Sequence, residues 1–129
     1  MMVEKGTASL GNVLIVDDEV LMLKTIRRIL QKFGYTATVA QGGAAGIDAY
    51  VAGRFDLVVL DLSMPEINGA ECFRQIRAID ADAAVLICTG YGDETQTAEM
   101  LAAGAKGILR KPFEPSALVD AVASLRRRD

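Results

Sequence analysis

Short apolar runs of strand length alternate along this chain with segments of helical periodicity, and this alternation limits the possible folds. Four of the apolar runs lie at residues 13–16, 57–60, 84–88 and 107–109. Between them, apolar residues recur at steps of three and four, which is typical of amphipathic helices. Strands that alternate with helices predict βαβ units and a parallel sheet covered on both faces.

The same patterns predict where the individual elements begin and end. The first helix is expected to bury Leu23, Ile26, Leu30 and Phe33, and to stop at Gly34, since glycine commonly follows a helix end. We expect five strands at about residues 12–17, 36–40, 56–61, 83–89 and 106–109. The later helices are predicted at about 44–52, at 69–79, from an N-cap at Asp93 to 103, and from Pro115 to about 125.

Length and composition favour one ordinary intracellular α/β domain. The chain has 129 residues and a formal net charge of −3, which gives no general argument for nucleic-acid binding. Residues 1–11 lack the apolar core of a signal peptide, and no apolar run approaches the ~20 residues of a membrane span. Cys72 and Cys88 are expected to be buried, reduced side chains. The basic run at 126–128 is expected to be a solvated helix end.

Polar residues follow four of the predicted strands, at the point where each strand ends. Asp17 and Asp18, then Asp61, then Thr89, and then Lys111 come directly after or at the end of an apolar run. Ligands of open parallel sheets bind at the carboxyl ends of the strands. Three carboxylates, a hydroxyl and an ammonium group are therefore expected to meet at one edge of the sheet.

This set of side chains is suited to phosphoryl transfer. Close carboxylates repel one another unless a cation lies between them, and oxygen ligands suit Mg²⁺, with Mn²⁺ as an alternative. Asp61 is the predicted nucleophile, because a carboxylate needs no base to form an acyl phosphate. The metal, Lys111 and the Thr89 hydroxyl would each neutralise or bind one phosphoryl oxygen. Pro112 follows Lys111 and permits a cis peptide that would direct the lysine inward.

The order of these residues resembles the receiver domain of bacterial two-component response regulators, from about Asn12 to Leu125. The supporting stretches are 13–19 (VLIVDDE), 61–65 (DLSMP), Gly69, 89–93 (TGYGD), 104–105 (GA) and 111–113 (KPF). The resemblance implies a flavodoxin-like (βα)5 fold with strand order 2-1-3-4-5. It also implies a phosphoacceptor protein of the cytoplasm, in which a histidine kinase or a histidine phosphotransfer protein phosphorylates Asp61, and hydrolysis resets it.

The resemblance also assigns roles to the residues around the acceptor. Asp17 and Asp18 would hold Mg²⁺ together with Asp61 and the backbone carbonyl of Ser63. Thr89 and Lys111 would contact the phosphoryl group. Ser63 and Tyr91 occupy positions that tune the lifetime of the phosphate in this family. The surface formed by the fourth helix, the fifth strand and the fifth helix would face partners.

One position departs from the family pattern. Receiver domains usually carry Tyr or Phe three residues before the lysine, and this chain carries Ile108 there. In the family, movement of the threonine is coupled to inward rotation of that aromatic ring. Ile108 has no ring and no hydroxyl, so we expect the phosphorylation chemistry to survive while the output step changes, or the domain to serve as a phosphate relay or sink.

Several alternatives remain open at this level. An aspartyl-phosphate hydrolase of the haloacid-dehalogenase type would carry a second Asp where this chain has Ser63, and it would usually have a cap domain. A flavodoxin would have a Ser/Thr/Gly-rich phosphate loop at 17–19, and a binding-only pseudo-receiver would have lost an acidic residue or the lysine. We expect an N-terminal extension at 1–11, a receiver domain at 12–126 and a tail at 127–129. The domain alone is not expected to be an enzyme beyond assisting its own phosphorylation and dephosphorylation. It could be free-standing, attached to an output domain, or part of a hybrid histidine kinase.

Overall fold

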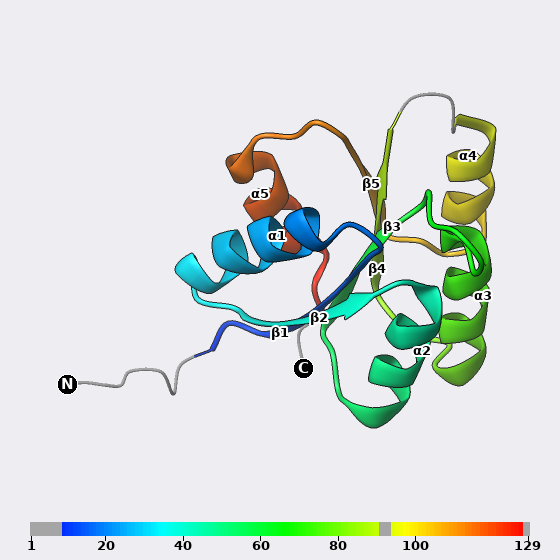
Figure 1. Ribbon diagram of the computed structural model, residues 1–129, viewed down its shortest axis with the longest axis horizontal. Helices are drawn as coiled ribbons and strands as arrows, with labels where there is room; N and C mark the ends of the chain where they lie inside the picture. The colour runs from blue at the N-terminus through cyan, green and yellow to red at the C-terminus, as the bar shows by residue number, and fades with distance from the viewer. Residues whose placement is uncertain (1–8, 91–93, 128–129) are drawn as a thin grey trace.

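Five parallel strands form the centre of the computed structural model, which describes residues 9–90 and 94–127 (Figure 1). Their order in the sheet is β2-β1-β3-β4-β5, as predicted. The strands are β1 (Asn12–Asp17), β2 (Thr36–Gln41), β3 (Leu57–Asp61), β4 (Val85–Thr89) and β5 (Gly107–Arg110). The helices are α1 (Val20–Lys32), α2 (Gly43–Ala52), α3 (Gly69–Ile79), α4 (Glu94–Ala102) and α5 (Pro115–Leu125). The chain therefore has the flavodoxin-like architecture.

Helices cover both faces of the sheet, α1 and α5 on one side and α2, α3 and α4 on the other (Figure 1). Alternate residues of β1 serve the two cores: Val13 and Ile15 pack towards α1 and α5, whereas Leu14 and Val16 pack towards α2 and α3. Both sets are buried, which explains why the strand sequence is apolar without alternation. Helices thus cover both faces of the sheet, and only the ends of its strands are available for ligands.

Most predicted element boundaries agree with the structure to within two residues. The predicted burial of Phe33, however, was wrong. Leu23, Ile26 and Leu30 are buried along α1, whereas Phe33 is 49% exposed. The helix ends at Lys32, so Phe33 is the C-cap and no longer follows the helical stripe. Gly34 has φ +99°, the left-handed conformation that glycine adopts without steric cost, and so stops the helix as predicted.

At Arg126 and Arg127 the structure differs from the prediction of a solvated helix end, and Arg128 lies outside the described residues. The Nη1 atom of Arg126 donates a hydrogen bond of 2.6 Å to the carbonyl of Leu10, and its guanidinium lies 5.8 Å from the centre of the Tyr35 ring. Arg127 forms an ion pair of 2.9 Å with Asp80. Both arginine side chains therefore bind other parts of the domain. Cys72 and Cys88 are buried and free, as predicted.

Replacing Tyr50 with Phe is expected to lower the free energy of unfolding by about 1 kcal/mol. The Tyr50 hydroxyl donates a hydrogen bond of 2.6 Å to Asp80 and so joins α2 to the end of α3. Burial and the Asp80 carboxylate raise the pKa of Tyr50 to about 12, so this bond persists at neutral pH. Urea denaturation monitored by circular dichroism measures the change. Tyr35→Phe is the matched control, because no hydrogen bond from its hydroxyl is found within residues 9–90 and 94–127. An equal loss in both variants would contradict a specific role for the Tyr50 bond.

Candidate functional site

The carboxyl ends of four strands bring the predicted polar residues to one edge of the sheet. Asp17 and Asp61 are the last residues of β1 and β3, which pair directly, and Thr89 is the last residue of β4, beside β3. The Asp17, Asp61 and Thr89 residues are only 2%, 4% and 1% exposed. Buried polar groups need hydrogen-bonding or charged partners, which indicates a specific site at the carboxyl ends of these strands.

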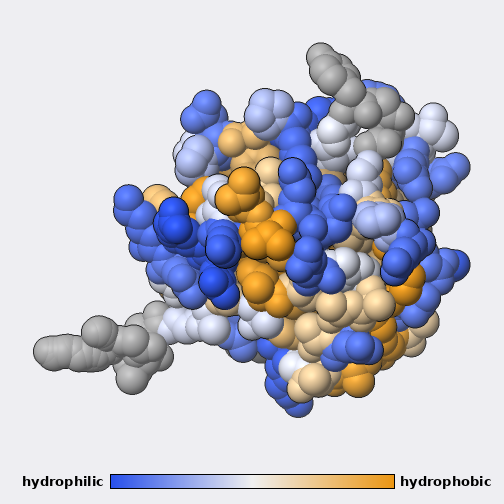
Figure 2. All heavy atoms as spheres, viewed as in Figure 1, coloured by the Kyte–Doolittle hydropathy of each residue, from blue (hydrophilic) through white to orange (hydrophobic). Residues whose placement is uncertain are grey.

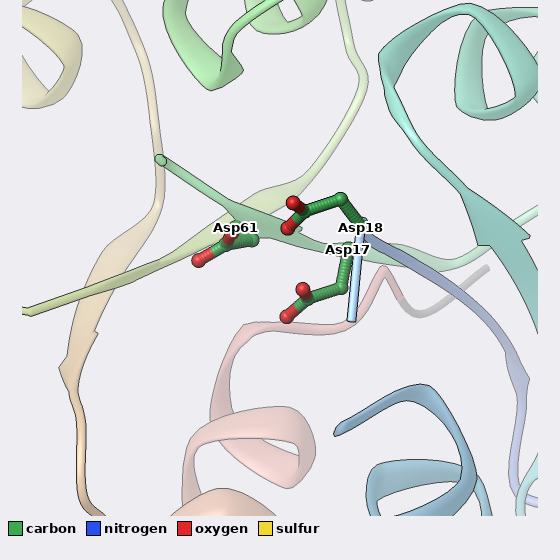
Figure 3. A group of neighbouring side chains, drawn as sticks. All are labelled: Asp17, Asp18 and Asp61. Atoms are coloured by element: carbon green, nitrogen blue, oxygen red, sulfur yellow. The ribbon is translucent and has the colours of Figure 1, made fainter. Parts of the chain in front are cut away.

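Three carboxylates converge there. One oxygen from each of Asp17, Asp18 and Asp61 lies within 4.8 Å of the other two. Figure 3 shows the three side chains extending from the ends of β1 and β3 towards a shared space. Asp17 also accepts a hydrogen bond of 2.9 Å from the backbone N–H of Glu19, which orients its carboxylate. Three oxygen ligands with open positions fit a hard divalent cation such as Mg²⁺.

Lys111 reaches the same group of carboxylates from the end of β5. Its Nζ atom donates a hydrogen bond of 2.8 Å to Oδ1 of Asp61 and lies 3.4 Å from Oδ2 of Asp17. The peptide bond between Lys111 and Pro112 is cis, the geometry that the sequence suggested. The backbone N–H of Lys111 donates to the carbonyl of Thr89 at 2.8 Å, which fixes the lysine beside β4. The ammonium therefore stands within direct reach of Asp61.

The positive charge near Asp61 does not balance the negative charge of the neighbouring carboxylates. Burial raises the pKa of Asp61, the hydrogen bond from Lys111 lowers it, and the charges of Asp17 and Asp18 raise it again, so the result lies above the ordinary value. Burial lowers the pKa of Lys111, but the hydrogen bond and the charges of Asp61 and Asp17 outweigh it and raise the pKa overall. One lysine faces three carboxylates, so an added cation would relieve their repulsion.

The remaining predicted residues occupy the rim of the site or lie further away. The Thr89 hydroxyl donates to the carbonyl of Gly90 at 3.3 Å. Ser63 is exposed in the loop that follows β3. Ile108 is half-buried, packs against the core on the α2–α4 side and pairs with Ile87 of β4. Tyr91 and Asp93 lie outside the described residues.

Two supporting features were not predicted in these roles. Gly69, the first residue of α3, has so little space that a Cβ atom would lie 2.6 Å from the carbonyl oxygen of Asp61. Asn68 caps the same helix by accepting a hydrogen bond of 2.9 Å from the N–H of Glu71. An Asn followed by Gly before a helical stripe was the available signal for the cap. The close approach to the Asp61 backbone has no local sequence signal, because it depends on tertiary packing.

Comparisons with known proteins agree with this architecture. The family model described as "Response regulator receiver domain" matches residues 13–123. The chain is 37% identical over 111 residues to the chemotaxis protein CheY of Thermotoga maritima, covering 85% of this chain and 92% of that protein. It is 35% identical over 116 residues to the response regulator MprA of Mycolicibacterium vanbaalenii, covering 90% of this chain but 50% of that longer protein.

Solved structures give the same result. The structure of the chemotaxis protein CheY4 of Vibrio cholerae superposes with a TM-score of 0.85 at 28% identity, covering 91% of this chain and 99% of that one. A response regulator receiver domain protein from Clostridium thermocellum also superposes with a TM-score of 0.85, at 30% identity, covering 89% of this chain and 93% of that one. The similarity therefore extends over nearly the whole fold, including every strand that contributes to the carboxylate edge.

Proposed function

Because this chain belongs to the receiver-domain family of response regulators, we propose that it accepts a phosphoryl group on Asp61 in a two-component signalling pathway. The donor is the phosphohistidine of a histidine kinase or of a histidine phosphotransfer protein. Family membership favours this function over an aspartyl-phosphate hydrolase or a flavin-binding protein. The observation that carries the proposal is the 2.8 Å hydrogen bond between Lys111 and a buried Asp61 carboxylate.

In the proposed reaction, an oxygen of Asp61 attacks the phosphorus of the phosphohistidine in line with the leaving nitrogen. The O–P bond forms as the N–P bond breaks, and the imidazole leaves with its electron pair and takes up a proton from water. The Lys111 ammonium group leaves the Asp61 carboxylate and binds one phosphoryl oxygen. The Thr89 hydroxyl donates a hydrogen bond to another phosphoryl oxygen. Attack of water on phosphorus later returns Asp61 to its carboxylate and releases phosphate.

The residues present fit a divalent cation, and we propose Mg²⁺, with Mn²⁺ as a substitute. Asp17, Asp18 and Asp61 would hold it with their carboxylates, and Ser63 with its backbone carbonyl. When bound, the cation supplies positive charge for one phosphoryl oxygen and for the three carboxylates. Ser63 and Tyr91 are proposed to control how readily water reaches the phosphorus.

The domain limits proposed from the sequence, 12–126 for the receiver with flanking segments at 1–11 and 127–129, remain a proposal. The same holds for an output domain, or a hybrid kinase, as the parent of this segment. No helix among residues 9–90 and 94–127 combines the length and apolar character needed to cross a bilayer. The proposed setting is the cytoplasm, where histidine kinases phosphorylate their receivers.

The proposal is tested by the intact mass of the protein after incubation with acetyl phosphate and Mg²⁺. We expect the mass to increase by one phosphoryl group, and the increase to disappear when a chelator removes the metal. The phosphohistidine of a protein donor is the second substrate to try. If neither donor modifies the protein, the carboxylates serve only the structure and the chain is a pseudo-receiver.

Replacing Asp18 with Ala is expected to weaken Mn²⁺ binding by at least about tenfold, since even outer-shell changes cost that much at metal sites. Asp18 supplies one of three converging carboxylates and is only partly buried, so its loss should leave the fold intact. Electron paramagnetic resonance of free Mn²⁺ measures the binding constant. Asp82→Ala, which removes an exposed carboxylate elsewhere, is the control. An unchanged titration in Asp18→Ala would remove this residue from the proposed site.

Replacing Ile108 with Tyr is expected to leave the rate of labelling by acetyl phosphate within about twofold of the unmodified protein. Ile108 packs against the core beside α3 and α4 and contributes no atom to the carboxylate group. The rate is measured by intact mass over time. A large loss of rate would show that this position supports the chemistry and not only the output.

A further inference from the structure

The exposed face of helix α2 is largely apolar, which is uncommon for a helix at a protein surface. Its exposed positions follow one helical stripe, and Asp48 is the only charged residue in the helix. That stripe consists of Ala44, Ala45, Asp48, Val51 and Ala52. Figure 2 shows the corresponding region, at the lower right, as a largely apolar area. A helix that is apolar on its outer face as well as its inner face is usually covered by another structure.

Larger apolar side chains extend this area at the end of α2. Val51 is 65% exposed and Ile79, at the end of α3, is 49% exposed. Both line a hollow of about 560 Å³ together with Phe55, and charged side chains that include Asp56 and Arg127 line the rest of it. Contiguous exposed apolar surface of this type commonly marks a protein interface. We name the exposed α2 stripe together with Phe55 and Ile79 the α2 patch.

Two opposite charges flank Val51 at equal separations in the sequence, one within α2 and the other just after the helix ends at Ala52. Asp48 lies three residues before Val51, and Arg54 lies three residues after it, and both are exposed. Neither side chain has an ion-pair partner within the described part of the chain. A surface with an acid on one side of a centre and a base on the other is complementary to its own copy turned by 180°.

We propose that the α2 patch binds a second copy of this chain, with two α2 helices antiparallel and Val51 on the two-fold axis. In this arrangement Asp48 of each copy faces Arg54 of the other, which forms two ion pairs around a contact of Val51 with Val51. The small side chain of Ala52, beside Val51, allows the two helix ends to approach closely. The N-terminal half of each α2 would then extend towards Phe55 and Ile79 of the other copy and cover them.

The dimer is expected to be weak, and its centre lies away from the three carboxylates. Val51 is the last residue but one of α2, so an axis there lets only the C-terminal turns of the two helices overlap. The interface therefore falls below the ~1,200 Å² of stable complexes and suits a dissociation constant of roughly 0.1–1 mM. Ala44 and Ala45, at the N-terminal end of the patch, line a small hollow with Asp18. Val51 and Arg54 line the hollow that also holds Asn12, the first residue of β1, so the centre of the patch lies at the opposite edge of the sheet.

Charge reversal tests the proposal directly. Sedimentation equilibrium of the full chain up to about 1 mM should show a reversible dimer. Asp48→Arg and Arg54→Asp should each weaken it about tenfold, because each turns two attractive pairs into two repulsive ones. The double variant, with both charges exchanged, should return the dissociation constant to within about threefold of the original. Asp120→Arg, an equal charge reversal at an exposed position of α5, is the control and should change nothing.

A crosslink locates the axis. Val51→Cys should form an interchain disulfide on mild oxidation, and the native Cys72 and Cys88 should not compete because both are buried. A protein that remains monomeric to 1 mM would overturn the proposal. So would a dimer that is insensitive to both charge reversals, or one that the double variant does not restore. In those cases the α2 patch does not bind a second copy, and a different protein becomes the candidate that covers it.

Discussion

Asp61→Asn is expected to abolish phosphorylation by acetyl phosphate and Mg²⁺ completely, with no increase in intact mass at any incubation time. The amide keeps the shape of the side chain but cannot form the acyl phosphate, and no other described carboxylate has an ammonium at 2.8 Å. Asp17 is the nearest competitor, because Lys111 also lies 3.4 Å from it. Residual labelling, mapped to Asp17 by peptide mass spectrometry, would contradict the assignment of Asp61 as sole acceptor.

The same variant should fold at least as stably as the unmodified protein in metal-free buffer. The pKa of Asp61 is raised by burial and by the neighbouring carboxylates, which means that the folded state disfavours its charge at neutral pH. A neutral amide removes that repulsion, although it also gives up the ion pair with Lys111. Urea denaturation with and without Mg²⁺ measures both effects, and the stabilisation by Mg²⁺ should be smaller in Asp61→Asn. Asp82→Asn, an exposed carboxylate, is the control for labelling and stability.

Much of the fold could be predicted from the sequence because two independent signals agree. Apolar runs without alternation indicate strands covered on both faces, and the helical stripes between them require parallel crossovers. Once the sheet is parallel, the last residues of its strands must share one edge. Asp17, Asp61 and Thr89 could therefore be grouped from the sequence alone, although 44 residues separate the first two and 28 the last two.

Features that depend on individual contacts could not be predicted in the same way. Phe33 continues the apolar stripe of α1, but the chain turns at Gly34, and no local rule places the ring in solvent. The arginines after α5 have the composition of a solvated helix end, yet Arg126 binds Leu10, which is 116 residues away. Contacts over such separations follow from the packing of the whole domain and not from spacing within the sequence.

Gly69→Ala is expected to lower the free energy of unfolding by about 2–3 kcal/mol and to slow labelling of Asp61. The added methyl group would lie 2.6 Å from both the carbonyl oxygen of Asp61 and the Cα atom of Leu62. These are backbone atoms of the acceptor strand and of the loop after it, so they cannot move aside as the end of a flexible side chain would. The steric clash is relieved only if α3 shifts away from β3, or if β3 shifts at Asp61, the residue that carries the nucleophile.

Gly90→Ala is the matched control for this effect, because a methyl group there has no heavy atom of the described residues within 4 Å apart from its chain neighbours, although Gly90 directly follows Thr89. Its free energy of unfolding should stay within about 0.5 kcal/mol of the original. The two variants are compared by urea denaturation and by the rate of mass increase with acetyl phosphate. If Gly69→Ala were as stable and as readily labelled as Gly90→Ala, the contact between α3 and the Asp61 backbone would not position the acceptor. The expected result, a joint loss of stability and rate confined to Gly69→Ala, would mean that this contact fixes both the fold and the direction of the nucleophile.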